Sequence, residues 1–248
     1  MNELRIIPVT FADEIRSANS LTKALLKKLS ALKLRRGDIL IVKHKIVSKA
    51  EGRLVDLDEI RPSAKTRAWA RRYQLDPRVT QLAIRESKRL VRQKNGVLIT
   101  ETQHGFVCAN SGVDVSNVDG GRHALLLPQN PDASAKKLQR ALQKHFRVSV
   151  PVIISDTFGR PWREGLTEVA IGVAGMKALH DYRGRHDPHG YPLRVTMEAV
   201  ADELACAAGL VCGKLARAPA CIIRGFEYRS ARGSARDLIR PRERDLFL

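Results

Sequence analysis

Short apolar segments with the composition of β-strands are interspersed irregularly with amphipathic helical segments along this chain. The strand-like segments lie at residues 5–10, 39–43, 89–91, 96–102, 104–110, 148–155 and 218–225. The helical ones lie at 20–34, 63–74, 78–88, 133–146 and 196–215. Because no regular strand–helix–strand repeat runs through this order, we predict an α+β fold of mixed sheets with packed helices, not a doubly wound parallel sheet. We expect residues 1–248 to form one unit, large enough for two lobes, and no boundary between them can be placed.

Three local patterns lead to more detailed expectations. Five leucines recur at helical spacing in the segment 20–34, and Ser20 before them is a suitable N-cap. The stretch 44–52 reads as a polar connection that ends in SKAEG, after the apolar strand. Residues 155–165, SDTFGRPWREG, are expected to form a loop at the carboxyl end of the buried strand 148–155. Ligands of sheets flanked by helices bind outside such strand ends.

The charge balance leaves two classes of protein open. The chain has 44 Lys and Arg residues against 26 Asp and Glu residues, a net charge of +18. One interpretation is a non-catalytic nucleic-acid-binding protein, although no zinc-finger spacing, RNP1 motif or recognition-helix pattern accompanies the charge. The other is a surface that attracts anionic small molecules such as nucleotides. The chain shows no run of about 18 apolar residues and no signal-peptide pattern, so we expect a cytoplasmic protein.

The familiar nucleotide-binding motifs do not occur in this sequence. GLVCGKL begins at Gly209, but it has three residues where the P-loop has four, and Leu215 stands where that motif needs Ser or Thr. No G-x-G-x-x-G opens a helix. A nucleotide would therefore have to bind by another route, and one such route is metal-assisted.

Oxygen-bearing side chains follow two of the strand-like segments. Asp156 and Thr157 come directly after the buried strand, and Asp114 lies in the segment SGVDVSNVDGG with Asn117 three residues on. Mg²⁺ prefers oxygen ligands and takes one or two carboxylates together with phosphate oxygens, so this set suits it. The alternative is that both aspartates cap turns, a common task for Asp.

Basic side chains near these positions are candidates for binding anions. Lys49 is placed to reach a phosphate, and Arg160 and Arg163 flank Trp162 in a way that suits a clamp on phosphate or carboxylate. For each of them the alternative is a solvated surface position.

Five blocks of the sequence, in order, resemble the coenzyme F420 gamma-glutamyl ligases. They are KIVSKAEGR, ANSGVDVSNV, SDTFGRPWREGLTEVAIGVAG, VADELACAAGLVCGK and ACIIRG, and the resemblance spans residues 37–225. It implies an α+β fold particular to that family and an intertwined homodimer. It also implies that L-glutamate is joined to the coenzyme F420 precursor with GTP, using Mg²⁺ or Mn²⁺ and potassium as a further cation.

The resemblance assigns roles to individual residues. It places metal binding on Asp114, Asp156 and Thr157, and nucleotide contacts on His44, Lys45, Lys49 and Asn117. Two departures stand out. The family has a Pro- and Gly-containing segment with paired acids near its N-terminus, where this chain has PVTFADEIRSANSL, so nucleotide contacts from Ala12 to Ile15 are not assigned. Lys214 stands where archaeal members have a metal-binding glutamine. A lysine there would neutralise phosphate, so we assign Lys214 to nucleotide binding.

The mechanism expected from this resemblance is carboxylate activation by phosphorylation. The precursor's carboxylate would attack the γ-phosphate of GTP to form an acyl phosphate, which the amine of glutamate would then displace, and further γ-linked glutamates could follow. Asp156, Arg160 and Arg163 are the predicted catalytic residues. A related amide ligase with another acceptor or nucleotide remains an alternative.

Overall fold

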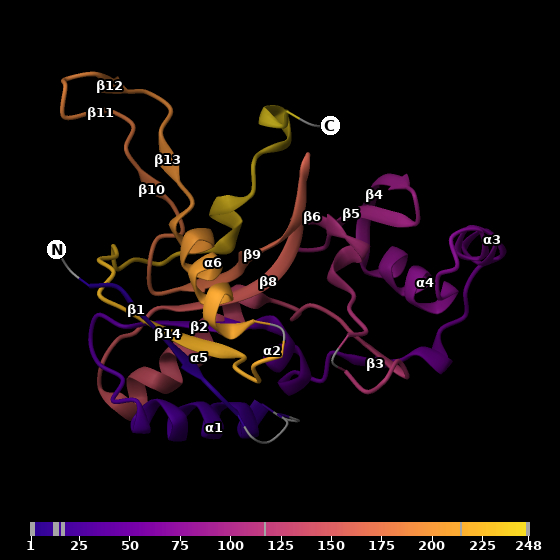
Figure 1. Ribbon diagram of the computed structural model, residues 1–248, viewed down its shortest axis with the longest axis horizontal. Coiled ribbons are helices and arrows are strands. Elements are labelled where there is room, and N and C mark those ends of the chain that lie inside the picture. The colour runs from indigo at the N-terminus through magenta and orange to yellow at the C-terminus, as the bar shows by residue number, and fades with distance from the viewer. Residues whose placement is uncertain (1–2, 12–14, 16–17, 117, 214, 247–248) are drawn as a thin grey trace.

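The computed structural model describes residues 3–11, 15, 18–116, 118–213 and 215–246 (Figure 1). Its centre is a five-stranded sheet in the order β1-β14-β2-β8-β9. The bounds of these strands are Arg5–Val9 (β1), Ala220–Arg224 (β14), Ile39–Lys43 (β2), Val152–Arg160 (β8) and Arg163–Ala174 (β9). Only β2 and β8 pair in parallel among these neighbours; the other pairs are antiparallel. The mixed sheet agrees with the predicted α+β class.

Helices cover both faces of this sheet. Helices α1 (Ala18–Ala31) and α5 (Pro131–Phe146) lie on one face and α6 (Val200–Cys212) on the other (Figure 1). Leu21, Leu25 and Leu29 of α1 are buried, as their helical spacing predicts. The alanines of α6 let it pack closely on β9 and β14. The central sheet and its helices therefore enclose one continuous apolar core.

A second group of elements lies to one side, at the right of Figure 1. It contains helices α3 (Ala64–Arg72) and α4 (Pro77–Glu86) and the antiparallel strands β4 (Ser87–Lys94), β5 (Val97–Thr102) and β6 (Val107–Ala109). Strand β3 (Leu54–Asp56) pairs with β7 (His123–Leu125) beside them. A separate apolar cluster holds this group together, formed by Leu57, Ile60, Leu82, Ala83, Leu98, Val113, Ala124 and Leu126.

The remaining elements are short. Residues 180–198 form a projecting arm in which β10 (His180–Asp181) pairs with β13 (Met197–Glu198), and β11 (Arg185–His186) pairs with β12 (Pro192–Leu193) (Figure 1). The 3₁₀ helices are Leu57–Glu59, Asn110–Gly112, Ala235–Leu238 and Arg242–Arg244. Within the described ranges, every helix is too short or too polar to span a bilayer.

Three local expectations were wrong. Helix α1 begins at Ala18, so Ser20 lies inside its first turn and is not the N-cap. The stretch after β2 is helix α2 (His44–Ala50), which buries His44, Val47, Ser48 and Ala50. Strand β8 continues through Asp156 to Arg160 because it pairs with β9 along its whole length, so SDTFGRPWREG is a hairpin and not a loop.

Gly172 of β9 allows the start of α5 to approach the sheet, and its replacement tests that packing. A Cβ at this position would lie 2.5 Å from the carbonyl carbon and oxygen of Pro131, which are backbone atoms. We expect Gly172→Ala to lower the free energy of unfolding by about 1–3 kcal/mol, measured by urea denaturation. Gly159→Ala is the matched control, since its Cβ would meet nothing closer than Leu166 Cδ2 at 3.9 Å. Equal stability of the two variants would contradict the packing argument.

Candidate active site

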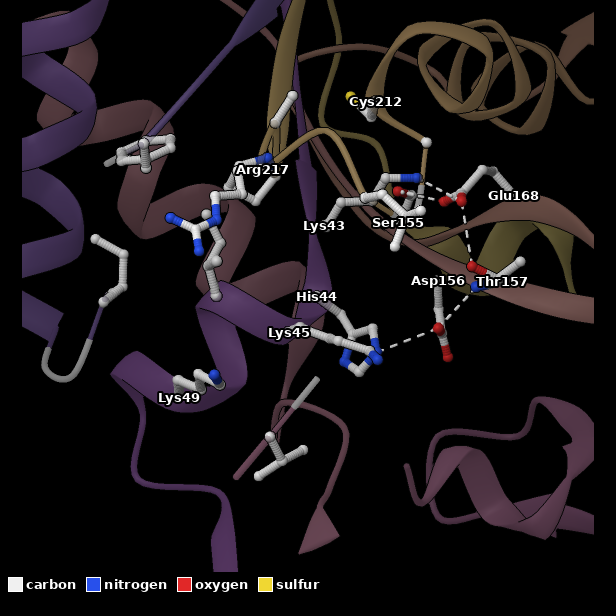
Figure 2. A pocket seen from close by; sticks show the side chains of 18 residues that line it. Lys43, His44, Lys45, Lys49, Ser155, Asp156, Thr157, Glu168, Cys212 and Arg217 are labelled. Atoms are coloured by element: carbon white, nitrogen blue, oxygen red, sulfur yellow. Dashed lines mark hydrogen bonds and ion pairs between the residues drawn. The ribbon is translucent and has the colours of Figure 1, made fainter. Parts of the chain in front are cut away.

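A cavity of about 640 Å³ opens at the carboxyl end of β2, beside the middle of β8 (Figure 2). The two strands run parallel, with Lys43, the last residue of β2, opposite Ser155, so the cavity lies at the carboxyl-terminal edge of β2, and β8 continues past it to Arg160. Helix α2 begins directly after Lys43, and Asp156 and Thr157 follow Ser155. This is the edge at which sheets flanked by helices bind ligands. The segment after α6, with Arg217, forms the opposite wall.

Asp156 lies in the cavity wall above the imidazole of His44. His44 is 2% exposed, and its Nε2 is 3.2 Å from Asp156 Oδ1. The direction of this approach is not that of a hydrogen bond, so Nε2 is a buried polar atom without a hydrogen-bond partner in the described part of the chain. On the other side of the ring, Nδ1 is 3.3 Å from Ser48 Oγ. Asp156 Oδ1 also accepts the backbone N–H of Thr157 at 2.7 Å.

Glu168 of β9 is a cavity residue that the sequence analysis missed. Its carboxylate is bonded to three neighbours that also line the cavity: the Ser155 and Thr157 hydroxyls and the Lys43 ammonium (Figure 2). Lys43 was missed as well. For Glu168, the signal that could have revealed it is the register of the β8–β9 hairpin, which places it opposite Thr157.

Positive charge exceeds negative charge among the described residues that line this cavity. Lys43, Lys45, Lys49 and Arg217 contribute cations, whereas Asp156 and Glu168 contribute carboxylates. Lys49 is the predicted residue of the SKAEG block, and α2 places it on the cavity (Figure 2). Arg217, which sequence reasoning also missed, has a backbone φ of 49°. A cavity with this charge suits an anionic ligand.

Asp114 lies beside the cavity lining and reaches it through Lys45. The Lys45 ammonium is 2.6 Å from Asp114 Oδ2, and it donates to the backbone and side-chain oxygens of Ser116 at 2.9 Å. Asp114 Oδ1 accepts the Ser116 N–H at 2.6 Å. Burial acts to raise the pKa of Asp114, but the hydrogen bonds from Lys45 and Ser116 outweigh it and the pKa is lowered. Both carboxylate oxygens of Asp114 are therefore engaged within the chain.

The structure does not bring the two predicted arginines to the cavity. Arg160 and Arg163 pair at the far end of the β8–β9 hairpin, on either side of Trp162, which is 82% exposed. Arg160 Nη2 donates to the carbonyl of Glu164 at 3.1 Å, and its Nε is buried without a hydrogen-bond partner in the described ranges. Their catalytic role stays a prediction. Asn117 and Lys214, two predicted nucleotide-binding residues, lie outside the described residues.

Comparison with known proteins assigns the chain to a family. The model of the F420-0:Gamma-glutamyl ligase family matches residues 11–225. The chain belongs to this family. All the cavity residues described above fall within the matched range.

Proteins named coenzyme F420:L-glutamate ligase are among its relatives. The one from Methanothermobacter thermautotrophicus is 47% identical over 214 residues, which is 85% of this chain and 84% of that protein. The one from Methanocaldococcus jannaschii is 45% identical over 212 residues, which is 85% of this chain and 84% of that protein. The one from Methanopyrus kandleri is 43% identical over 249 residues, 98% of this chain and 97% of that protein. The resemblance seen in the five sequence blocks is thus confirmed at the level of the family.

The side chains that this F420-0:gamma-glutamyl ligase family member presents to the cavity fit a divalent cation at one position. The described residues contain no group of three His, Cys, Asp or Glu residues arranged as a metal site. Mg²⁺, however, takes one or two carboxylates and completes its shell with water and phosphate oxygens. Asp156 and Thr157 both line the cavity, and the Thr157 hydrogen is directed to Glu168, so the hydroxyl oxygen acts as an acceptor toward other groups.

Proposed function

We propose that this protein is a ligase that joins L-glutamate to the carboxylate of the coenzyme F420 precursor, coupled to the conversion of GTP to GDP and phosphate. The supporting observation is the cavity at the end of β2, where Asp156 and Thr157 of β8 share one space with four cationic side chains. A carboxylate and a hydroxyl suit Mg²⁺ or Mn²⁺, and the cations suit phosphate groups. The names of the relatives supply the acceptor and the amino acid.

The reaction that we propose has two steps. A carboxylate oxygen of the precursor forms a bond to the γ-phosphorus of GTP, and the bond from that phosphorus to the β–γ bridging oxygen breaks to release GDP. The amine nitrogen of glutamate then attacks the carbonyl carbon of the acyl phosphate. Inorganic phosphate leaves with the bonding electrons, and the nitrogen gives up a proton as the amide forms. A carboxylate needs this activation because it is a poor electrophile.

The residues of the chain contribute by position and charge. Asp156 and Thr157 would hold a divalent cation, which neutralises charge on phosphate oxygens when bound. Lys43, Lys45, Lys49 and Arg217 add positive potential around the same space. The His44 imidazole lies against the Asp156 carboxylate, with Nε2 3.2 Å from Oδ1. Phosphoryl transfer of this kind depends on positioning and electrostatics and needs no nucleophile from the enzyme.

Mass spectrometry of the products tests the proposal directly. The protein is incubated with the deazaflavin precursor, L-glutamate, GTP and Mn²⁺, and we expect products heavier by one or more glutamyl units that are absent without GTP. The number of units counts the additions. Replacement of GTP by ATP tests the nucleotide, addition of potassium tests that ion, and light scattering in solution tests the homodimer expected from the resemblance.

Failure of this assay would separate the alternatives. A folded protein that binds GTP but forms no product would indicate an amide ligase with another acceptor. A protein that binds neither GTP nor ATP, but binds arbitrary DNA with an affinity that falls steeply with salt, would indicate the nucleic-acid-binding alternative.

Replacement of Lys49 tests whether this cavity residue contacts the phosphates of GTP. We expect Lys49→Gln to raise the KM for GTP about tenfold, because a charge-assisted contact to phosphate of about 1.5 kcal/mol is lost. The KM for glutamate should change little. Lys23→Gln, on the exposed face of α1, removes the same charge away from the cavity and is the matched control. An unchanged KM for GTP in the Lys49 variant would remove this residue from the nucleotide site.

A further inference from the structure

Glu168 is a buried carboxylate that faces the cavity and is not among the residues assigned a role above. Its side chain is 10% exposed. Oε1 accepts the hydroxyl of Thr157 at 3.1 Å and pairs with the Lys43 ammonium, and Oε2 accepts the hydroxyl of Ser155 at 3.0 Å (Figure 2). One carboxylate thus organises three side chains that come from two parallel strands.

The position of Glu168 is fixed from two sides. The pairing of β8 with β9 places it opposite Thr157. Helix α6 packs against it, with the Cys206 thiol donating to its backbone carbonyl at 3.1 Å. Gly209 of α6 leaves the space that its side chain occupies, since a Cβ there would lie 2.8 Å from Glu168 Cγ. The carboxylate is therefore held in one place relative to the cavity.

The hydrogen bonds of Glu168 restrict what the two hydroxyls can offer to a ligand. A hydroxyl has one hydrogen, and a carboxylate paired with a lysine can only accept. Ser155 and Thr157 therefore direct their hydrogens to Glu168 and present lone pairs to other partners. Oxygens in this state suit a cation and do not suit a phosphate oxygen, which needs a donor. Together with the Asp156 carboxylate they supply acceptor oxygens to this part of the cavity lining.

We propose that Glu168 is a positioning residue of this site. It holds the Thr157 hydroxyl in the orientation in which its oxygen can bind a divalent cation, and it keeps the Lys43 ammonium in the cavity wall. This inference rests on the proposed function, because it gives Glu168 a task only where Asp156 and Thr157 bind such a cation. Partners that orient metal ligands in this way typically affect metal affinity by 10–100-fold.

The experiment measures Mn²⁺ binding by the electron paramagnetic resonance signal of free Mn²⁺, on the full chain without nucleotide. Glu168→Gln keeps the shape of the side chain but adds an amide donor that competes for the Thr157 oxygen. We expect the Kd for Mn²⁺ to rise at least tenfold. Product formation should fall at low Mn²⁺ and recover in part when Mn²⁺ is saturating. Glu203→Gln, an exposed position at the start of α6, is the matched control and should bind as the wild type does.

A double-mutant cycle distinguishes positioning from direct binding. If Glu168 acts through the hydroxyl, Glu168→Gln should weaken Mn²⁺ binding far less in a Thr157→Val background than in the wild type. Full additivity of the two losses would overturn the positioning role. So would a Glu168→Gln variant that binds Mn²⁺ as tightly as the wild type does. A wild type that binds no Mn²⁺ would instead overturn the cation site of the proposed function, and the role of Glu168 with it.

A second variant covers the case in which Glu168→Gln does not fold. Gly209→Ala leaves the carboxylate in the protein but places a Cβ 2.8 Å from Glu168 Cγ, so the carboxylate must move. We expect weaker Mn²⁺ binding with a thermal midpoint close to that of the wild type, because alanine favours a helix more than glycine does. Unchanged Mn²⁺ affinity in this variant would also overturn the proposal.

Discussion

Replacement of Asp156 by Asn is expected to lower kcat/KM for product formation about 10³-fold while the protein stays folded. Asn keeps the size of the side chain, and its carbonyl oxygen can still accept the Thr157 N–H. What it removes is the negative charge that would hold a divalent cation beside the phosphates. Charge stabilisation of this kind is worth several kcal/mol in the transition state, and each 1.36 kcal/mol corresponds to a factor of ten in rate.

The measurement combines steady-state kinetics with urea denaturation of the same samples. Asp58→Asn removes an equal charge from an exposed ion pair with Arg78, outside the residues that line the cavity, and should leave turnover unchanged. An Asp156→Asn enzyme with wild-type turnover would remove Asp156 from the chemistry. A variant that has lost its folded structure would give no information on rate, so the denaturation curve is part of the result.

The elements that could be predicted from the sequence are those whose own residues determine them. The leucine spacing of α1 and the KNG turn between β4 and β5 are local patterns, and the structure confirms both elements. Helix α2 was missed because its seven residues include the β-branched Ile46 and Val47, which disfavour a helix. Its stability comes from the burial of Val47 and Ala50 in the central apolar core, which no local pattern reveals.

Local sequence patterns also identify only part of the candidate site. Asp156 and Thr157 were predicted because they directly follow a recognisable buried strand, and both line the cavity. Glu168 lies eleven residues further on, and only the register of the hairpin brings it opposite Thr157. Lys43 likewise becomes a site residue through the parallel pairing of β2 with β8. Residues that join a site only through strand pairing cannot be identified from the residues next to them in the sequence.

Replacement of Arg224 by Met is expected to lower the free energy of unfolding by about 3 kcal/mol, through loss of a buried ion pair. Asp38, just before β2, is fully buried and its two oxygens lie 2.7 and 2.8 Å from Arg224 Nε and Nη2 at the end of β14. This pairing raises the pKa of Arg224. Without the guanidinium, the Asp38 carboxylate keeps only the backbone N–H of Arg35 at 2.9 Å among the described contacts.

Urea denaturation of this variant is compared with that of Arg183→Met, which leaves the exposed Asp181 without its ion-pair partner. The exposed pair is solvated before and after the change, so we expect little effect there. Replacement of both partners, Asp38→Leu with Arg224→Met, should recover much of the lost stability, because the main penalty is the unpaired buried charge and not the absence of attraction. A double variant no more stable than Arg224→Met alone would mean that the geometry of the pair itself joins the two strands. The pair would then be a structural requirement of the end of the sheet that lies opposite the cavity.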